Sequence, residues 1–478
     1  MGEIEFLEQV EKAAEFLRES KPERVRIVSH LDADGITSAA ILIRVMNRLN
    51  KLYNISVVQS VTPELLDLVN SDCSDFVVFS DLGSGCISKI KEKIKDKRVI
   101  VLDHHVPEKE NEPNAQGKRV MSINPHFFGI DGNSDISGSG VAYLFANAVS
   151  RKNRDLAHIA VIGAIGDMQE NFGFSGTNRR ILKHALESGK LEERRGIRLF
   201  GSHSRPIHKL LEYSTEPYIP GITGSESNAI QLLGRIGINP KKGTNDWKRL
   251  FDLSDEEARA LASAIIMLRT RSGASNAESI IGPLYEIKDE KPGSPLKDAR
   301  EFATLLNACG RLGLSSYGIG ACLNEAKLKK KSIETLNSYR KEIIKGLKWV
   351  KKSAEDKQHI IKGENYMIIN AQENIMPTMI GTIASILAKS NEIPENTFIL
   401  SLAHLPENGK IKCSLRYCGN NDVDLKEVID YIVAQVEGES GGHKNAAGAF
   451  IPLEKEKQFI ESAMSALSMF GYEEKITN

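Results

Sequence analysis

Short apolar runs alternate with stretches of helical spacing in the first part of the chain. The apolar runs, which are typical of buried strands, are Arg24–Ser29, Ile55–Gln59, Phe76–Ser80, Val99–Asp103 and Val120–Ile123. The predicted helices are an opening helix with Ile4, Leu7, Val10, Ala14 and Leu17 on the face packed against the sheet, then Gly35–Asn50, Pro63–Val69 and Gly85–Lys95. This alternation predicts an α/β fold with a doubly wound parallel sheet.

Three of these runs end in acidic and imidazole side chains. The first run is followed by His30, Asp32 and Asp34, the third by Asp81, and the fourth ends in Asp103, His104 and His105. Because the carboxyl ends of parallel strands meet at one edge of a sheet, we expect these side chains to lie close together. Asp167, which ends the apolar helix-like run Ala157–Gly166, is a fourth contributor.

Such a cluster favours a divalent metal centre. Each motif alone could be a helix-capping acid beside surface histidines. Four acid-bearing segments together would repel one another unless cations neutralised them. Carboxylates and imidazoles are also the ligands that Mn²⁺ and Mg²⁺ sites use. The residues therefore predict a site for two divalent metal ions.

Helical periodicity dominates from about Lys190 to Asp356, as in Asp255–Arg269 and Ala299–Ala308. One long helix is predicted over Ala326–Lys352, and its lysines form either a solvated face or a track for a nucleic-acid backbone. Strand and helix patterns return afterwards, at Tyr366–Ile369, Thr378–Ser390, Thr397–Leu402, Ile411–Arg416, Leu425–Gln435, Gly448–Ile451 and Lys455–Leu467. A helical insert between two α/β domains is the expected organisation.

Glycines form two notable segments. The loop Gly129–Gly140 precedes a predicted helix, Val141–Ser150, and its amides could either hold a phosphate or cap the helix. Gly441–Gly448 (GGHKNAAG) is predicted as a loop whose amides can approach a phosphate, with His443 as a donor.

Composition narrows the class of protein. The chain has 478 residues, 41% hydrophobic and 26% charged, as in ordinary globular proteins. Its 63 basic and 63 acidic residues cancel, so a nucleic-acid partner would have to meet local basic patches. The six cysteines form no CxxC pair and no apolar run reaches membrane-spanning length, so we expect a cytoplasmic protein without a membrane partner.

The motifs resemble those of a known superfamily. His30–Gly35 (HLDADG), Asp81, Asp103-His104-His105 and Asp167 resemble the four motifs of the DHH phosphoesterases, and the GGH segment resembles that of their companion DHHA1 domain. The DADG form and the chain length look most like the RecJ exonuclease branch, in particular the archaeal RecJ-like nucleases associated with the GINS replication complex. The resemblance implies a DHH catalytic domain at 1–190, a helical insert at 191–325, a connecting helix at 326–356 and a DHHA1 substrate-binding domain at 357–478.

The resemblance also implies residue roles. Asp81 would bridge two metal ions, with Asp34, His104 and Asp167 completing one site and Asp32 and His30 the other. His105 would touch the phosphate or orient a ligand, and Asp103 would orient its neighbours. The substrate-binding residues of the second domain would be Ser414, Arg416, Gly441, Gly442 and His443.

The expected activity is a metal-dependent exonuclease, with Mn²⁺ preferred over Mg²⁺. Its substrate would be single-stranded DNA degraded from the 5′ end, in DNA replication or repair. The alternatives are an exonuclease for RNA from the 3′ end, an enzyme for short oligonucleotides or other small substrates, and a non-catalytic replisome scaffold that binds GINS. Members of that scaffold class have lost metal ligands, and the residues predicted here as ligands are all present.

Overall fold

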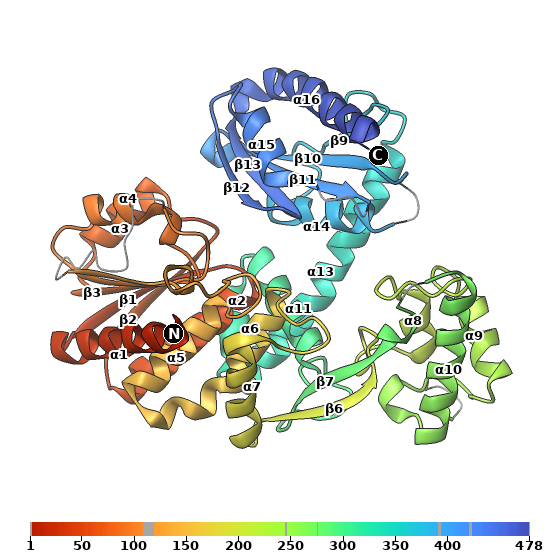
Figure 1. Cartoon of the computed structure of the whole chain (residues 1–478), viewed down its shortest axis with the longest axis horizontal. Coiled ribbons are helices and arrows are strands. Elements are labelled where there is room, and N and C mark those ends of the chain that lie inside the picture. Colours follow the sequence, from red (N-terminus) through yellow and green to blue (C-terminus); the bar gives the residue numbers. More distant parts are fainter. Residues whose placement is uncertain are drawn as a thin grey trace. The chain divides into compact units, whose positions relative to one another are not determined.

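The computed structural model describes residues 2–108, 119–243, 246–274, 276–390, 393–419 and 423–477. The side chains of His443 and of residues from 471 onward lie outside this description. The chain divides into two compact units, Met1–Leu336 and Asn337–Asn478, and each is described by itself (Figure 1). The helix α13 (Ala326–Lys352) contains the boundary and has the bounds predicted from the sequence.

The first unit is built on a five-stranded parallel sheet, which confirms the predicted fold class. The strands lie in the order β2-β1-β3-β4-β5, so the winding direction changes between β1 and β3. Their bounds are β1 (Arg24–His30), β2 (Leu52–Val58), β3 (Phe76–Ser80), β4 (Arg98–Leu102) and β5 (Val120–Ile123). The three central strands, β1, β3 and β4, carry most of the buried β-branched and aromatic side chains, as expected for a sheet covered on both faces.

Helices cover both faces of this sheet (Figure 1). One face packs against α3 and α4 through an apolar cluster that includes Leu66, Ile90 and the strand residues Val77 and Phe79. The other face carries the remaining helices of this part. The bounds of the six helices are α1 (Gly2–Ser20), α2 (Ala33–Arg48), α3 (Pro63–Ser71), α4 (Ile87–Lys93), α5 (Gly138–Val149) and α6 (Ala157–Gly166).

The buried face of α1 differs from the predicted one. Ile4 is 67% exposed, whereas Phe6 is fully buried and packs against the ring of Phe128 at 5.7 Å. Val10, Ala14 and Leu17 are buried as predicted. The helix therefore packs through the Phe6 side, because the larger aromatic ring removes more apolar surface from water.

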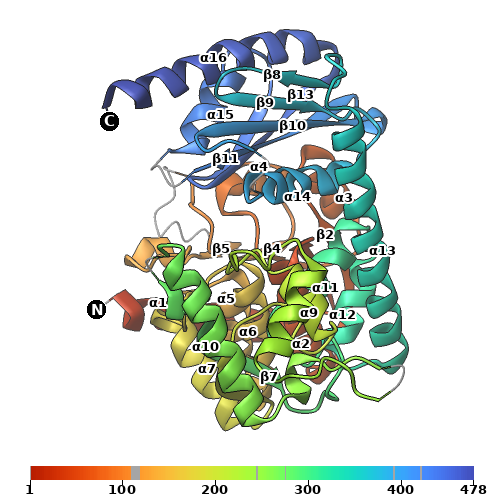
Figure 2. The same ribbon diagram turned by 90° about the vertical axis from the view of Figure 1, so that its right-hand side faces the viewer.

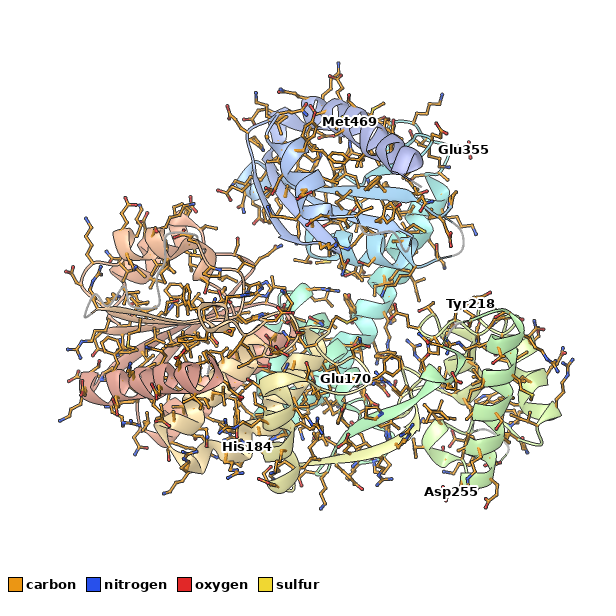
Figure 3. The ribbon with its side chains drawn as sticks, viewed as in Figure 1. Glu170, His184, Tyr218, Asp255, Glu355 and Met469 are labelled. Carbon is orange, nitrogen blue, oxygen red and sulfur yellow. The ribbon has the colours of Figure 1, made fainter. Side chains whose placement is uncertain are left out.

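The predicted helical insert contains a strand ribbon as well as helices. The antiparallel strands β6 (Leu191–Ile197) and β7 (Ile281–Ile287) enclose a helical segment with its own apolar core, which includes Ile207, Leu233 and Leu261. Side chains around this segment are drawn in Figure 3, where Tyr218 marks the loop between α8 and α9. The helices from α7 to α12 are α7 (Gly176–Glu187), α8 (Ile207–Glu212), α9 (Glu226–Arg235), α10 (Asp255–Arg271), α11 (Ala299–Arg311) and α12 (Ser315–Cys322).

The second unit is a smaller α/β domain, as predicted. Its six-stranded mixed sheet has the order β12-β13-β11-β10-β9-β8, with α14 on one face and α15 and α16 on the other (Figure 2). The strands are β8 (Ile360–Lys362), β9 (Tyr366–Asn370), β10 (Thr397–Leu405), β11 (Lys410–Cys418), β12 (Glu439–His443) and β13 (Ala446–Pro452). The helices are α14 (Pro377–Ala388), α15 (Leu425–Val433) and α16 (Glu456–Thr477).

The GGH segment, predicted as a loop, forms strand β12. It pairs antiparallel with β13 in a tight hairpin, in which Gly441 lies opposite Gly448 and Gly442 opposite Ala447. Glycine has a low strand propensity, so the local sequence favoured a loop, but pairing with β13 satisfies the backbone groups.

Within the described ranges, no helix has both the length and the apolar character needed to cross a membrane.

Candidate metal centre

Three adjacent strands bring the acidic residues to one edge of the sheet. His30 is the last residue of β1, and Asp32 caps α2 by accepting a hydrogen bond from the Gly35 amide at 2.9 Å. Asp81 follows β3 and Asp103 follows β4. Because β1, β3 and β4 are neighbours in the sheet order, the three motifs converge as the sequence predicted.

His104 is oriented as a metal ligand would be. Its Nδ1 lies 2.6 Å from the carbonyl of Gly132 and donates to it, which leaves the lone pair on Nε2. That Nε2 lies 3.2 Å from Asp81, 3.7 Å from Asp167 and 3.8 Å from Asp34. The ring is 4% exposed and Asp34 and Asp81 are buried with it, whereas the Asp167 side chain is 28% exposed.

The Gly129–Gly140 loop serves Asp34. The amides of Gly138 and Ser139, at the start of α5, donate to the Asp34 carboxylate at 2.7 and 3.1 Å. The Ser137 hydroxyl accepts from the Gly140 amide at 3.3 Å. These amides are therefore engaged, and the interpretation of this helix start as a phosphate site is wrong for them. They fix the carboxylate and stabilise its charge at a helix N-terminus.

Two glycines make room for this arrangement. A Cβ on Gly138 would lie 2.5 Å from Oδ1 of Asp81, and a Cβ on Gly163 would lie 2.6 Å from Oδ1 of Asp34. Real Cβ atoms do not approach so closely. The close packing of α5 and α6 on Asp34 and Asp81 therefore requires glycine at both positions.

Asp81 lies between two groups of possible ligands. His30, Asp32 and Asp81 place one ligand atom each within 4.8 Å of one another, and Asp34, His104 and Asp167 do the same. Asp81 adjoins the second group too, through His104. Its two carboxylate oxygens are buried and have no hydrogen-bond partner in the described structure, and neither does Nε2 of His104. Buried polar atoms are normally paired, so this donor set fits divalent cations.

The charges within the cluster are strongly coupled. Burial and the carboxylates of Asp81 and Asp167 raise the pKa of Asp34. Burial raises the pKa of Asp167 to about 6. Burial alone would lower the pKa of His104, but the surrounding carboxylates outweigh it and raise that pKa well above its usual value. The cluster thus draws positive charge into a buried space, as expected of a cation site.

Asp103 is occupied with holding its neighbours. Its Oδ2 accepts from the Ser84 amide at 2.8 Å, and its Oδ1 accepts from the amides of His104 at 2.8 Å and His105 at 3.2 Å. The same oxygen lies 2.8 Å from Nδ1 of His105. Burial would lower the pKa of His105, but Asp103 raises it to about 8. The His105 ring is 37% exposed and can reach solvent or a ligand.

The predicted residues of the second unit lie on β11 and β12, which pair with opposite edges of β13. Ser414 of β11 lies opposite Gly448 of β13, which in turn lies opposite Gly441 of β12. The Arg416 guanidinium donates to the Ser385 hydroxyl at 2.8 Å and to the carbonyls of Leu415 and Ala447, so it is held within the unit. Ser414 is buried.

Gln169 and Asn307 also support the cluster, and the sequence pattern gave no reason to select them. The Gln169 side-chain amide donates to Asp167 Oδ2 and to the Gly132 carbonyl, both at 2.8 Å, so it links the supports of Asp167 and His104. Asn307 accepts from the Ala33 amide at 3.0 Å, between Asp32 and Asp34. Gln169 follows Asp167 by two residues, which is the only local signal that could have pointed to it.

Three family models match the chain in sequence order. They are the N-terminal domain of the DHH family over residues 24–166, the DHH-CID domain over 199–281 and the DHHA1 domain over 363–469. The first includes His30, Asp32, Asp34, Asp81, Asp103, His104 and His105, and it ends directly before Asp167.

Two relatives are similar in sequence. An uncharacterized protein of Methanocaldococcus jannaschii is 31% identical over 469 residues, which cover 96% of this chain and 97% of that protein. The single-stranded-DNA-specific exonuclease RecJ of Thermus thermophilus is 27% identical over 277 residues, which cover 54% of this chain and 36% of RecJ.

Two solved structures share the fold. RecJ from Thermus thermophilus, in complex with Mn²⁺, has a TM-score of 0.59 at 17% identity, over 96% of this chain and 55% of the RecJ chain. CDC45 from Entamoeba histolytica has a TM-score of 0.64 at 12% identity, over 97% of this chain and 99% of the other.

Proposed function

Because this chain belongs to the DHH/DHHA1 superfamily and is RecJ-like, we propose that it is a metal-dependent exonuclease for single-stranded nucleic acid. The observation that carries the proposal is the buried donor set around Asp81, whose two carboxylate oxygens have no hydrogen-bond partner in the described structure. Two groups of ligands adjoin this one carboxylate. A protein that acted only as a scaffold would not need a buried carboxylate between two groups of ligands.

The proposed ligands form two groups. Asp34, His104 and Asp167 would hold one ion, His30 and Asp32 would hold the other, and Asp81 would contribute to both. When bound, the two cations, with Mn²⁺ proposed over Mg²⁺, supply an activated water and stabilise the charge that develops on the phosphate.

The remaining residues position and bind. Asp103 fixes the backbone and the ring of His105, which is 37% exposed and is proposed to donate a hydrogen bond to a phosphate oxygen. Gly132 and Gln169 fix the ligand atoms of His104 and Asp167. In the second unit, Ser414, Arg416, Gly441, Gly442 and His443 are proposed to hold the strand.

The proposed substrate is single-stranded DNA degraded from the 5′ end in replication or repair. The support is the sequence similarity to RecJ, which is named for single-stranded DNA and matches over 54% of this chain. RNA degraded from the 3′ end and short oligonucleotides are the alternatives for the same centre.

The test is degradation of long single strands of DNA and RNA, labelled at either end, with Mn²⁺, Mg²⁺ or EDTA. We expect metal-dependent loss of DNA from the 5′ end, abolished in Asp81→Ala and in the Asp103→Ala/His104→Ala double variant. Cleavage of RNA from its 3′ end would keep the centre and replace the substrate. Full Mn²⁺-dependent activity in either variant would contradict the proposal.

A scaffold role is the second candidate, because CDC45 shares the fold over nearly the whole chain. The proposed partner is the GINS complex, docked on the segment between β6 and β7. The antiparallel pair Ile197 and Ile281 ends the ribbon, so the residues between them can be replaced by a short turn. Loss of GINS capture by that variant is the expected result, and unchanged capture would exclude this docking surface.

A further inference from the structure

The first unit contains a cavity of about 730 Å³ apart from the predicted metal ligands. Its walls are the loop after α6, the residues after β6, the loop between α8 and α9, and α11. This volume is in the range of pockets that hold ligands. The cavity includes none of the predicted metal ligands, and no role has been assigned to it so far.

The cavity is positively charged although the whole chain is neutral. Four arginines line it, Arg198, Arg205, Arg269 and Arg300, against two glutamates, Glu170 and Glu216, which leaves an excess of two positive charges. Glu170 is already neutralised, because its Oε2 accepts from Arg198 at 2.7 Å and from Arg300 at 2.8 Å. This is a local basic site of the kind that a neutral protein needs in order to bind nucleic acid.

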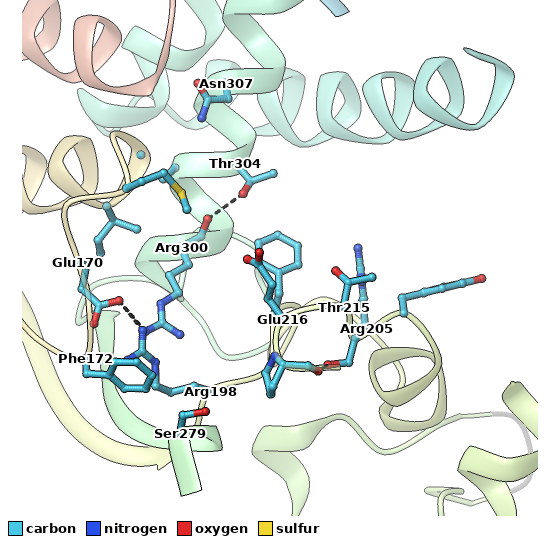
Figure 4. Close-up of a pocket in the computed structure, with 18 of the residues that line it drawn as sticks. Glu170, Phe172, Arg198, Arg205, Thr215, Glu216, Ser279, Arg300, Thr304 and Asn307 are labelled. Atoms are coloured by element: carbon cyan, nitrogen blue, oxygen red, sulfur yellow. Dashed lines mark hydrogen bonds and ion pairs between the residues drawn. The ribbon is translucent and has the colours of Figure 1, made fainter. Parts of the chain in front are cut away.

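Aromatic rings stand beside these arginines. The Arg198 guanidinium lies 4.6 Å from the centre of the Phe172 ring, and Arg205 lies 5.5 Å from that of Tyr213. Phe172 is 56% exposed and Tyr213 is 54% exposed, although both are large side chains. Figure 4 shows Phe172, Arg198 and Glu170 on one side of the cavity and Arg205, Thr215 and Glu216 on the other. Exposed aromatic rings interleaved with cations form the usual platform for single-stranded bases and phosphates.

The cavity and the metal centre share their walls. Gly166 and Met168, which line the cavity, flank Asp167 in the sequence. Asn307 also lines it and accepts from the Ala33 amide, between Asp32 and Asp34. The two sites are therefore next to one another along both α6 and the start of α2.

We propose that this cavity, hereafter the arginine–aromatic pocket, holds nucleotides of a single strand next to the scissile phosphate. Arg205 and Arg198 bind the backbone phosphates, and Tyr213 and Phe172 stack with bases. The inference deepens the proposed function and rests on it. Binding to the first unit would then depend on the length of the strand, because a substrate too short to reach the pocket makes none of its contacts.

The test compares variants of the full chain that leave the ion network of Glu170 untouched. Arg205→Ala and Tyr213→Ala remove one cation and one ring from the pocket. Arg195→Ala and Tyr218→Ala are the matched controls, because both residues are exposed, lie near Arg205 and Tyr213 in the sequence and do not line the pocket. Thermal melting of all four variants establishes that they are folded.

The first readout is binding without cleavage. Fluorescently labelled oligothymidylate and oligouridylate of about 20 nucleotides, longer than usual single-strand sites, are titrated in EDTA. We expect Kd to rise about tenfold in each pocket variant, from lost stacking or a lost phosphate contact. For Arg205→Ala, the slope of log Kd against log salt concentration should also become smaller by about one, because one phosphate contact is lost. The controls should stay within about twofold of the wild type.

The second readout is hydrolysis of the long strand with Mn²⁺, in which we expect KM to rise in the pocket variants and to stay at the wild-type value in the two controls. Pocket variants that bind both long probes like the wild type would overturn the inference while leaving the proposed function intact. A wild type that binds neither probe would overturn it as well. Pocket-dependent binding by a protein that cleaves nothing would instead refute the proposed activity and leave a strand-binding pocket.

Discussion

Asp81 occupies a backbone conformation that few residues adopt. Its φ is +59°, in the left-handed region, and its carboxylate is almost fully buried between His30 and His104. Aspartate and asparagine tolerate this region better than other non-glycine residues, but it still costs free energy. Such conformations concentrate at functional sites. The surrounding structure therefore holds the Asp81 carboxylate in place in spite of this cost.

Asp81→Asn tests whether the cluster is held at the expense of stability. Asparagine tolerates the same φ, so we expect a folded protein that melts at or above the wild-type temperature in EDTA, because one buried charge is gone. Mn²⁺ should stabilise the wild type much more than the variant. Activity should fall at least about a hundredfold, since several kcal/mol of charge stabilisation depend on the metals.

The exposed Asp96 provides the control, as Asp96→Asn should match the wild type in melting and in activity. If Asp81→Asn melts below the wild-type temperature in EDTA, the Asp81 carboxylate stabilises the fold and does not destabilise it through repulsion by the other carboxylates.

His158 gives the first unit a defined response to acid. It lies on α6, where burial lowers its pKa to about 4, and its Nδ1 donates to the Asp155 carbonyl at 2.9 Å. The unfolded value is about 6.5. Between these two values the unfolded chain binds a proton that the folded chain does not. Stability is therefore lost as the pH falls from about 6.5 to about 4.

His158→Asn should remove this increment. The difference in unfolding free energy between wild type and variant should change by at most about 1.4 kcal/mol per pH unit inside the window, and stay constant above it. Urea midpoints measured from pH 4 to pH 8 provide the check. Parallel pH profiles for the two proteins would mean that His158 is protonated equally in both states.

Sequence patterns predicted the cluster because its ligands follow strands. Asp81 comes directly after the buried strand β3, His104 comes two residues after β4, and the parallel sheet brings such positions together. The supports of the cluster carry no such pattern. Asn307 accepts a hydrogen bond from a group 274 residues away in the sequence, and Gln169 joins Asp167 to the Gly132 carbonyl, which is 37 residues away. Only the folded chain shows that these groups are neighbours.

The two strands of the ribbon, β6 and β7, were not predicted because their local sequences are unlike those of typical strands. β6 exposes Glu193, Arg194 and Arg195 in succession, so it lacks the alternation of a half-buried strand. β7 contains Gly282 and Pro283, which disfavour strands except at edges. A two-stranded ribbon has only edges, so pairing between the strands overrides these local preferences.

The hairpin of β12 and β13 contains one glycine that the backbone requires and one that is proposed to bind the strand. Gly442 has a φ of +126°, and a Cβ there would lie 2.5 Å from the Ala446 carbonyl oxygen, so Gly442→Ala should unfold the hairpin. A Cβ on Gly441 would meet nothing within 4 Å. Gly441→Ala should therefore leave the melting temperature unchanged and weaken strand binding, because a phosphate could no longer approach its amide.

Melting curves and binding to a labelled single strand, measured on both variants, decide this point. Wild-type binding by Gly441→Ala would remove its amide from the proposed strand-binding residues.

The proposed metal ligands belong to only one of the two compact units. All the proposed metal ligands lie in Met1–Leu336, whereas Asn337–Asn478 has a separate apolar core under its own sheet. A chain built in this way is not expected to unfold in one step. Of the two tryptophans, Trp349 lies in the second unit, against His359, so it reports on that unit alone.

In Trp247→Phe, where Trp349 is the only tryptophan, Mn²⁺ should leave the urea midpoint of fluorescence unchanged. Under the same conditions, Mn²⁺ should slow hydrogen exchange in peptides that span α2 and β4, because ligand binding stabilises only the structure that holds the ligand. An equal shift in both measurements would mean that the two units unfold together.

Gly138 also provides a way to sort related sequences. Any side chain at that position would displace Asp81, because the first carbon atom would already lie 2.5 Å from its carboxylate oxygen. A related chain that has lost glycine there can keep every aspartate and histidine of the motifs and still be unable to assemble them. The residue at this one position, outside the motifs, can thus distinguish related chains that can assemble the centre from chains that keep the motif residues but cannot assemble it.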